Sequence, residues 1–299
     1  MFLDIHAHVY RYPYPTPDGR FLMASPDQLL ERMDELAIDR AVLLPLVSPE
    51  LYVPQSVGEI IELAQASEGR FIPFCNIDPR VLTNSSDAPL GILLEHYKKL
   101  GCKGVGEVLP NMPWSEPRLQ NLLRCTEQAG LPLVFDITGR INSGYGIYDD
   151  PGLPQLEQCL QKYPNLVMVG HGPAFWAEIS VLRKVEDRLT YPSYPIDKEG
   201  RVVELLRTYP NLWVEISAGS GANALLRDME YAPKFLQEFS DRILFGTDIC
   251  YADQDLPQGC ILKTLLDAGK ISQDVFLDIA YRNGERLLSL APLENRRAF

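Results

Sequence analysis

The sequence alternates short apolar runs with segments of helical pattern, and this alternation restricts the fold more than any other feature. The apolar runs cover residues 3–5, 41–46, 71–77, 104–109, 132–135, 166–169, 212–216 and 243–245. Short apolar runs bounded by turn residues indicate buried strands, and strands that alternate with helices indicate a parallel sheet. Eight such units predict an α/β fold, the (β/α)8 TIM barrel, with a doubly wound open sheet as the alternative.

The helical segments carry their own start and stop signals. Ser25 can cap a helix, Pro26 suits its first turn, and Gln28 can complete a capping box. A glycine follows within two residues of each of the helical segments 55–67, 90–100 and 117–129. Because helices often end with a residue in the left-handed conformation, these glycines support the predicted helix ends.

Nothing along the chain divides it into parts. We find no low-complexity segment and no linker, so we expect one barrel domain over residues 1–299. Residues 10–19 and 190–200 are rich in Pro, Tyr and Asp. We interpret them as long loops at the C-terminal face of the barrel, where active sites are built, and therefore as walls of a substrate pocket.

Composition excludes several classes of function. The net charge is -12, and an acidic chain is a poor ligand for a nucleic-acid backbone, which is bound through Lys and Arg. No apolar run approaches the roughly 20 residues that span a bilayer, and the first residues lack a signal-peptide pattern. The six cysteines form no CxxC pair, as expected of free thiols. The sequence thus predicts a cytoplasmic protein with neither a nucleic-acid nor a membrane partner.

Two of the four histidines, His6 and His8, follow the first apolar run with one residue between them. Side chains at i and i+2 point to the same side of a strand, so both imidazoles can face the barrel mouth. We therefore predict that they bind one cation, with Asp4 as a supporting group. His96 lies in a helical segment with charged neighbours and is interpreted as a surface residue without a role.

Polar residues also stand at the ends of other predicted strands. Buried charged or imidazole groups are costly unless they are paired or bound to a cation, so their convergence at one face indicates a site. For single residues a structural role stays open: Glu107 could pair with Lys103, and His171 could order a turn. The strand-end residues are Glu107, Asp136, His171 and Asp248.

The motifs DIHAH, GCKGVGE, VGHG and LFGTD, in this order, resemble the amidohydrolase superfamily. The resemblance is greatest to the branch of metal-dependent hydrolases and decarboxylases that includes aminocarboxymuconate semialdehyde decarboxylase. It implies a distorted barrel with a divalent metal ion, commonly zinc, at the C-terminal mouth. The ligands that it implies are His6, His8, Glu107, His171 and Asp248.

One position departs from the family pattern. Asp136 stands where the family usually has a histidine at the end of the fifth strand. Carboxylate is a harder donor than imidazole, so we expect weaker binding of any second zinc ion and one ion per chain. Asp136 could instead contact the water or the substrate, and His171 could be a ligand or a catalytic imidazole.

These features predict hydrolysis of a small carboxylic ester, lactone or amide by a metal-activated water, with Asp248 as the proton acceptor. The alternatives are non-oxidative decarboxylation of an aromatic or unsaturated acid, and a catalytically inactive barrel that binds a ligand. We expect a small, anionic substrate and leave a homo-oligomer open. The residues expected to contact the substrate are Arg140 and Lys103 as anchors and Tyr145 and Trp176 as apolar walls.

Overall fold

The computed structural model describes residues 1–51 and 55–292, and a strand forms at each of the eight predicted apolar runs. The expectation of one domain over residues 1–299 also takes in 52–54 and 293–299, which lie outside the described residues, and it stays a prediction. The barrel strands are β1 (Phe2–Ala7), β4 (Ile38–Leu43), β5 (Phe71–Pro73), β6 (Val105–Val108), β7 (Leu133–Thr138), β9 (Met168–His171), β10 (Leu212–Glu215) and β11 (Ile243–Leu244).

The strands close into a barrel through two weakly bonded seams. Strands β1, β4 and β5 form one parallel sheet, and β11, β10, β9, β7 and β6 form the other. A bridge between Cys75 and Val105 joins β5 to β6. At the other seam, the Ile5 amide donates to the Phe245 carbonyl at 2.9 Å. The expected barrel is confirmed, and its distortion lies at these seams.

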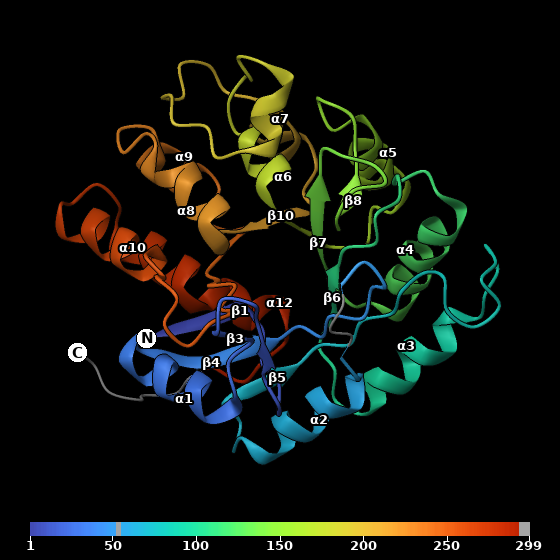
Figure 1. Cartoon of the computed structure of the whole chain (residues 1–299). Coiled ribbons are helices and arrows are strands. Elements are labelled where there is room, and N and C mark those ends of the chain that lie inside the picture. Colours follow the sequence, from blue (N-terminus) through green and yellow to red (C-terminus); the bar gives the residue numbers. More distant parts are fainter. Residues whose placement is uncertain (52–54, 293–299) are drawn as a thin grey trace.

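Helices surround the ring of strands (Figure 1). Ser25 and Gln28 form the predicted capping box at the start of the first helix. The helices are α1 (Pro26–Glu35), α2 (Val57–Ala66), α3 (Leu90–Lys99), α4 (Pro117–Ala129), α5 (Pro154–Lys162), α6 (Pro173–Ala177), α7 (Arg201–Thr208), α8 (Ala218–Leu226), α9 (Ala232–Glu238), α10 (Gln258–Asp267), α11 (Gln273–Leu277) and α12 (Asn283–Leu287), with a 3-10 turn η1 (Val185–Leu189) and a π turn η2 (Asp278–Arg282).

The apolar core has two layers that the barrel separates. Side chains from seven strands, among them Ile5, Val42 and Ile72, meet in one buried cluster. Only a closed barrel brings these strands together, so this cluster fills the interior. A larger cluster packs the outer face of the strands against the helices. The interior cluster forms a floor beneath the C-terminal ends of the strands.

The structure adds elements to the predicted loops. Strands β2 (Tyr14–Pro15) and β3 (Phe21–Leu22) form a small antiparallel hairpin in and after the segment 10–19. Strand β8 (Ile147–Tyr148) pairs with β7 beyond the barrel ring. No described helix has both the length and the apolar character needed to cross a membrane.

Candidate metal centre

The first strand brings the imidazoles of His6 and His8 together. Their Nε2 atoms lie 3.1 Å apart, and both side chains are buried. Nδ1 of His8 donates to the Leu44 carbonyl at 2.9 Å, which leaves Nε2 of His8 as the free ring nitrogen. Two Nε2 atoms at this distance have to share a proton or a cation, and the predicted orientation of the pair agrees with this geometry.

Two carboxylates complete the cluster. Glu107 Oε2 lies 3.6 Å from Nε2 of both His6 and His8. Asp248 Oδ1 lies 3.4 Å from His6 Nε2 and 3.3 Å from His8 Nε2. Ligand atoms around a tetrahedral zinc ion, with bonds of about 2.0 to 2.2 Å, are separated by about 3.3 to 3.6 Å. The donor types and their spacing therefore fit one small divalent cation.

His171, at the end of β9, borders this cluster. Its Nε2 atom lies 3.7 Å from Glu107 Oε1, and its ring centre is 4.5 Å from that of His6. Ser217 Oγ lies 3.1 Å from His171 Nδ1. His171 thus turns Nε2 toward the fourth-strand carboxylate, where it can act as a further ligand or as a catalytic imidazole.

The cluster also contains a residue that the sequence analysis missed, Glu215 at the end of β10. Its Oε1 atom lies 3.2 Å from His6 Nδ1 and forms a shorter contact with His171 Nδ1. Glu215 is fully buried. The sequence does contain a signal for it, since a glutamate stands inside the apolar run LWVEIS. A buried carboxylate is energetically costly unless it is paired, so a glutamate in such a run is expected to have polar partners.

Asp4 supports the site from below, as expected. Asp4 Oδ1 accepts hydrogen bonds from the amides of His6 and Thr247, each at 3.0 Å, and Oδ2 accepts one from the Thr247 hydroxyl at 2.5 Å. Burial raises the pKa of Asp4 to about 7, although these hydrogen bonds act in the opposite direction. Asp4 thereby ties β1 to the turn that carries Asp248.

Asp136 is the least satisfied group in the site. Its side chain is buried, and Oδ1 has no hydrogen-bond partner among the described residues. Burial and the negative charge of Glu107 raise the pKa of Asp136 well above its usual range. Gly172 has a φ of +100°, and a Cβ atom there would lie 1.9 Å from Asp136 Oδ1. A glycine is therefore needed beside this carboxyl group.

The carboxylates and imidazoles of the cluster shift one another's pKa values. Burial disfavours the charged form of His6, yet Asp248 and the other carboxylates hold the pKa of His6 well above its usual range. Burial also disfavours ionised Glu107, but the imidazoles hold its pKa well below that range. For His171, burial is outweighed by Glu215 and the pKa rises to about 9. Glu107 is thus ionised among positively charged imidazoles, and a divalent cation held by neutral imidazoles would supply the same positive charge.

A cavity of about 800 Å³ opens above the cluster. His8, Glu107, Asp136, His171 and Asp248 line it, so the convergence of strand ends gives one site. Two of the expected contact residues, Arg140 and Tyr145, also line this cavity, and Tyr191 represents the predicted wall segment 190–200. The described lining includes no residue of 10–19, but Leu22 and Met23 lie just beyond that segment.

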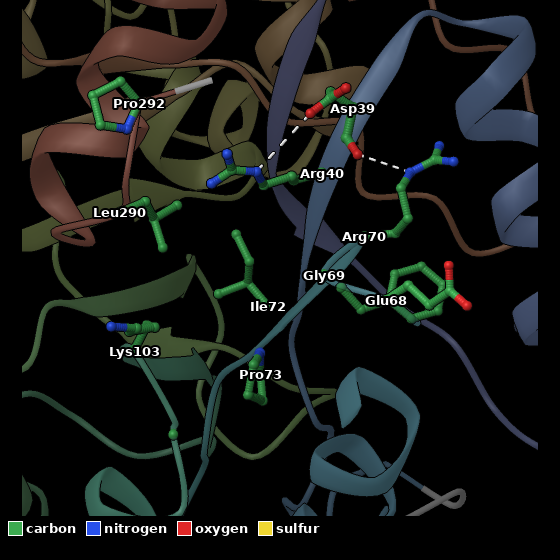
Figure 2. Close-up of a pocket in the computed structure, with 12 residues that line it drawn as sticks. Asp39, Arg40, Glu68, Gly69, Arg70, Ile72, Pro73, Lys103, Leu290 and Pro292 are labelled. Carbon is green, nitrogen blue, oxygen red and sulfur yellow. Dashed lines mark hydrogen bonds and ion pairs between the residues drawn. The ribbon is translucent and has the colours of Figure 1, made fainter. Parts of the chain in front are cut away.

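The other two expected contact residues lie elsewhere. Trp176 is buried against Phe175 and Phe235 in the outer core and is not among the described cavity-lining residues, because it belongs to a helix that packs on the barrel. Lys103 precedes β6 rather than following it. It lines a second hollow, of about 550 Å³, where β4, β5 and β6 begin (Figure 2). Its expected role as a substrate anchor is therefore wrong.

Solved structures with this fold include enzymes of different activities. A probable 2-pyrone-4,6-dicarboxylic acid hydrolase from Acinetobacter baumannii, with citric acid bound, is 16% identical at a TM-score of 0.59, and the match covers 97% of this chain and 99% of that one. A 2,6-dihydroxybenzoate decarboxylase is 16% identical at 0.56, with 97% and 98% covered. An amidohydrolase from Burkholderia multivorans with bound zinc is 14% identical at 0.58, with 97% and 100% covered.

At these identities the similarity establishes the fold alone. No curated protein matches the chain. The family model described as "Amidohydrolase" matches residues 3–290, a range that contains every residue of the cluster. The chain therefore belongs to the amidohydrolase family, whose members include hydrolases and decarboxylases.

Proposed function

We propose that the chain is a metal-dependent hydrolase that acts on a small carboxylic ester, lactone or amide. One observation carries the proposal: Nε2 of His6 and Nε2 of His8 lie 3.1 Å apart, and the carboxylates of Glu107 and Asp248 each lie 3.3 to 3.6 Å from both, at the floor of a cavity. The zinc-containing neighbour of the same fold supports zinc as the cation.

A bound divalent cation polarises a carbonyl group and makes water acidic enough to attack it near neutral pH. In this chain, His6, His8, Glu107 and Asp248 would hold that ion. The side chain of Asp248 is 22% exposed, whereas that of Glu107 is 6% exposed. Asp248 therefore reaches both the ligand cluster and the cavity, and we assign it the removal of a proton from the attacking water.

His171 on β9 and Asp136 on β7 are directly opposite each other on neighbouring strands. Both lie beside the carboxylates of Glu107 and Asp248. His171 is placed to stabilise charge or to donate a proton to the leaving group, and Asp136 is placed to contact the substrate. A carboxyl group held neutral by burial can donate a hydrogen bond, which suits contact with a carbonyl or carboxylate oxygen.

The cavity walls support an anionic substrate. Arg140 is exposed at the rim, and Arg188 is almost fully buried in the lining. Arg188 lies 2.8 Å from Glu178 and donates to the Asp149 carbonyl, so part of its charge is already compensated. Arg140 is therefore the stronger candidate for binding a substrate carboxylate. Tyr145 and Tyr191 supply apolar surface beside it.

Decarboxylation of an aromatic or unsaturated acid is the second candidate, since a decarboxylase and a probable hydrolase have this fold at nearly the same TM-score. The two reactions differ in what they release. The zinc-loaded protein is incubated with panels of lactones, esters, amides and carboxylic acids, and both the hydrolysis products, separated by chromatography, and carbon dioxide are measured.

Hydrolysis products without gas support hydrolysis, and carbon dioxide from the acid panel supports decarboxylation instead. A zinc-loaded protein that is inactive on both panels would contradict the proposal and favour the ligand-binding barrel. The assignment of proton transfer to Asp248 is tested with the variant Asp248→Asn. Its matched control is Asp253→Asn, because Asp253 is an exposed acid in the same loop.

A further inference from the structure

Glu215 is in contact with two histidines that come from different strands. Its Oε1 atom lies 3.2 Å from Nδ1 of His6, on β1, and in shorter contact with Nδ1 of His171, on β9. A glutamate on β10 thus contacts Nδ1 of each ring, whereas Nε2 of each ring faces the other residues of the cluster. We propose that Glu215 is a positioning residue that fixes His6 with Nε2 toward the metal ion and His171 with Nε2 toward Glu107; this inference rests on the proposed metal centre.

The hydrogen-bonding capacity of Glu215 is taken up by protein groups. Besides the two imidazoles, Oε1 accepts from the Ser217 hydroxyl at 2.9 Å, and Oε2 accepts from the Ser217 amide at 2.6 Å. An ionised carboxylate offers about four acceptor sites, and four donors meet it here. Three of these donors meet Oε1 and one meets Oε2, so both oxygens of Glu215 accept hydrogen bonds from protein groups.

The contact determines the tautomer of each ring. An ionised carboxylate can only accept hydrogen bonds, so Nδ1 carries the proton in both His6 and His171. Nε2 of His6 is then directed at His8 and Asp248, and Nε2 of His171 is directed at Glu107. This is the arrangement in which a second carboxylate orients a metal-ligating histidine and raises its basicity.

The hydrogen bonds of Glu215 also indicate which of two possible metal-binding groups holds the ion. His6, His8 and Asp248 form one group, and His6, His171 and Glu215 form the other. The second group is already held together by hydrogen bonds through Nδ1, so we expect it to remain without an ion. The chain should consequently hold one ion rather than two.

Packing leaves Glu215 little freedom to adopt another position. The residue is fully buried, and a Cβ atom on Gly246 would lie 2.8 Å from Glu215 Oε2. The glycine of the GTD motif therefore provides the space for this carboxylate. Because both imidazoles donate to this one buried carboxylate, the orientation of His6 on β1 is coupled to that of His171 on β9.

The tautomers can be measured without altering the chain. The protein has four histidines, so nitrogen-15 labelling of histidine gives few imidazole signals, with exposed His96 as an internal reference. We expect His6 and His171 to carry a proton on Nδ1 in both the metal-free and the zinc-loaded protein. A metal-bound or unprotonated Nδ1 on either ring in the zinc-loaded protein would overturn the inference.

Glu215→Gln tests the consequence for metal binding. A glutamine amide group places its NH2 against either the Ser217 amide or the two Nδ1–H groups, so one donor always opposes another. We expect the zinc dissociation constant, measured by chelator competition, to rise about 10- to 100-fold. Glu230→Gln, at an exposed acid, should leave it unchanged.

The outcomes separate the inference from the metal centre itself. Wild-type protein that binds no zinc would contradict the proposed function. Wild-type protein that binds zinc while Glu215→Gln binds it equally well would contradict the role of Glu215 alone, as would two retained ions per chain. If Glu215→Gln does not fold, as judged by circular dichroism, the tautomer measurement on the wild-type protein decides the question.

Discussion

The two ends of the barrel both carry a hollow lined by charged residues, but their charges are arranged differently. At the C-terminal end, His6, Glu107 and Asp248 approach one another and are largely withdrawn from water. At the N-terminal end, Arg70 pairs with Asp34 at 2.7 Å and is partly exposed. Lys103, which lines the same hollow, is also only partly buried (Figure 2). Partly exposed pairs of this kind contribute little energy. Mutual approach with burial, rather than charge itself, distinguishes a candidate reaction site.

The largest effect is expected from removing the two imidazoles of β1, His6 and His8, which would abolish the difference between the two ends of the barrel. The double variant His6→Ala with His8→Ala deletes two of the four converging donors. Zinc retained after dialysis, measured by elemental analysis, should fall from about one ion per chain to almost none, because the remaining carboxylates are poor zinc ligands by themselves.

His96→Ala is the matched control, since His96 is exposed on α3 and should leave the zinc content unchanged. Full retention of zinc by the double variant would mean that residues other than His6 and His8 hold the ion.

Asp248→Asn should have the next largest effect. The substitution nearly preserves shape but removes the proposed proton acceptor, so we expect kcat to fall on the order of 100-fold or more. Zinc content must be measured in the same samples, since Asp248 is also a proposed ligand. Turnover at the wild-type rate would refute the assigned proton transfer.

Arg140→Ala compares the two ends of the barrel directly. Arg140 lines the C-terminal cavity, whereas Lys103 lines the opposite hollow. Losing one charged contact of about 1.4 kcal/mol should raise KM for a carboxylate-bearing substrate about tenfold with little change in kcat. Lys103→Ala should change neither constant. Equal effects of the two variants would show that Arg140 acts through overall charge.

The sequence predicted the barrel well because strand and helix signals repeat along the chain. Each apolar run became a strand, and the capping residues Ser25 and Gln28 meet as predicted. The residues at strand ends were also brought together, because parallel strands place their C-terminal ends on one face. The hairpin of β2 and β3 was missed, since two-residue strands have no periodicity to detect.

The sequence was less informative about what surrounds the cluster. Lys103 precedes β6 and Glu107 lies near its C-terminal end, and the seven-residue motif GCKGVGE does not say that its two charged residues belong to opposite ends of the barrel. Trp176 follows His171 closely, yet its helix directs it into the outer core. Glu215 was hidden within an apolar run. These positions depend on packing across strands, which periodicity along one strand does not specify.

The smallest expected effect concerns an ion pair near the cavity that is structural. Arg80 donates to both carboxylate oxygens of Glu50 at 2.7 Å. Burial raises the pKa of Glu50, but Arg80 and the Ser48 hydroxyl outweigh it and lower the pKa from 4.5 to about 2. Because the unfolded chain then binds the proton more tightly, this contribution to stability is present above pH 4.5 and is lost as the pH falls toward about 2.

Glu50→Gln should therefore lower the free energy of unfolding by about 1 to 2 kcal/mol at pH 6, measured by urea denaturation, and by progressively less as the pH approaches 2. The control is Glu62→Gln, which breaks the exposed pair of Glu62 with Arg11 and should have little effect at either pH. A difference between wild type and Glu50→Gln that stays constant from pH 6 to 2 would place the effect in packing rather than charge. Because Glu50 lies outside the metal cluster, its loss should leave the zinc content unchanged, which separates the charges that stabilise the cavity wall from those that bind the ion.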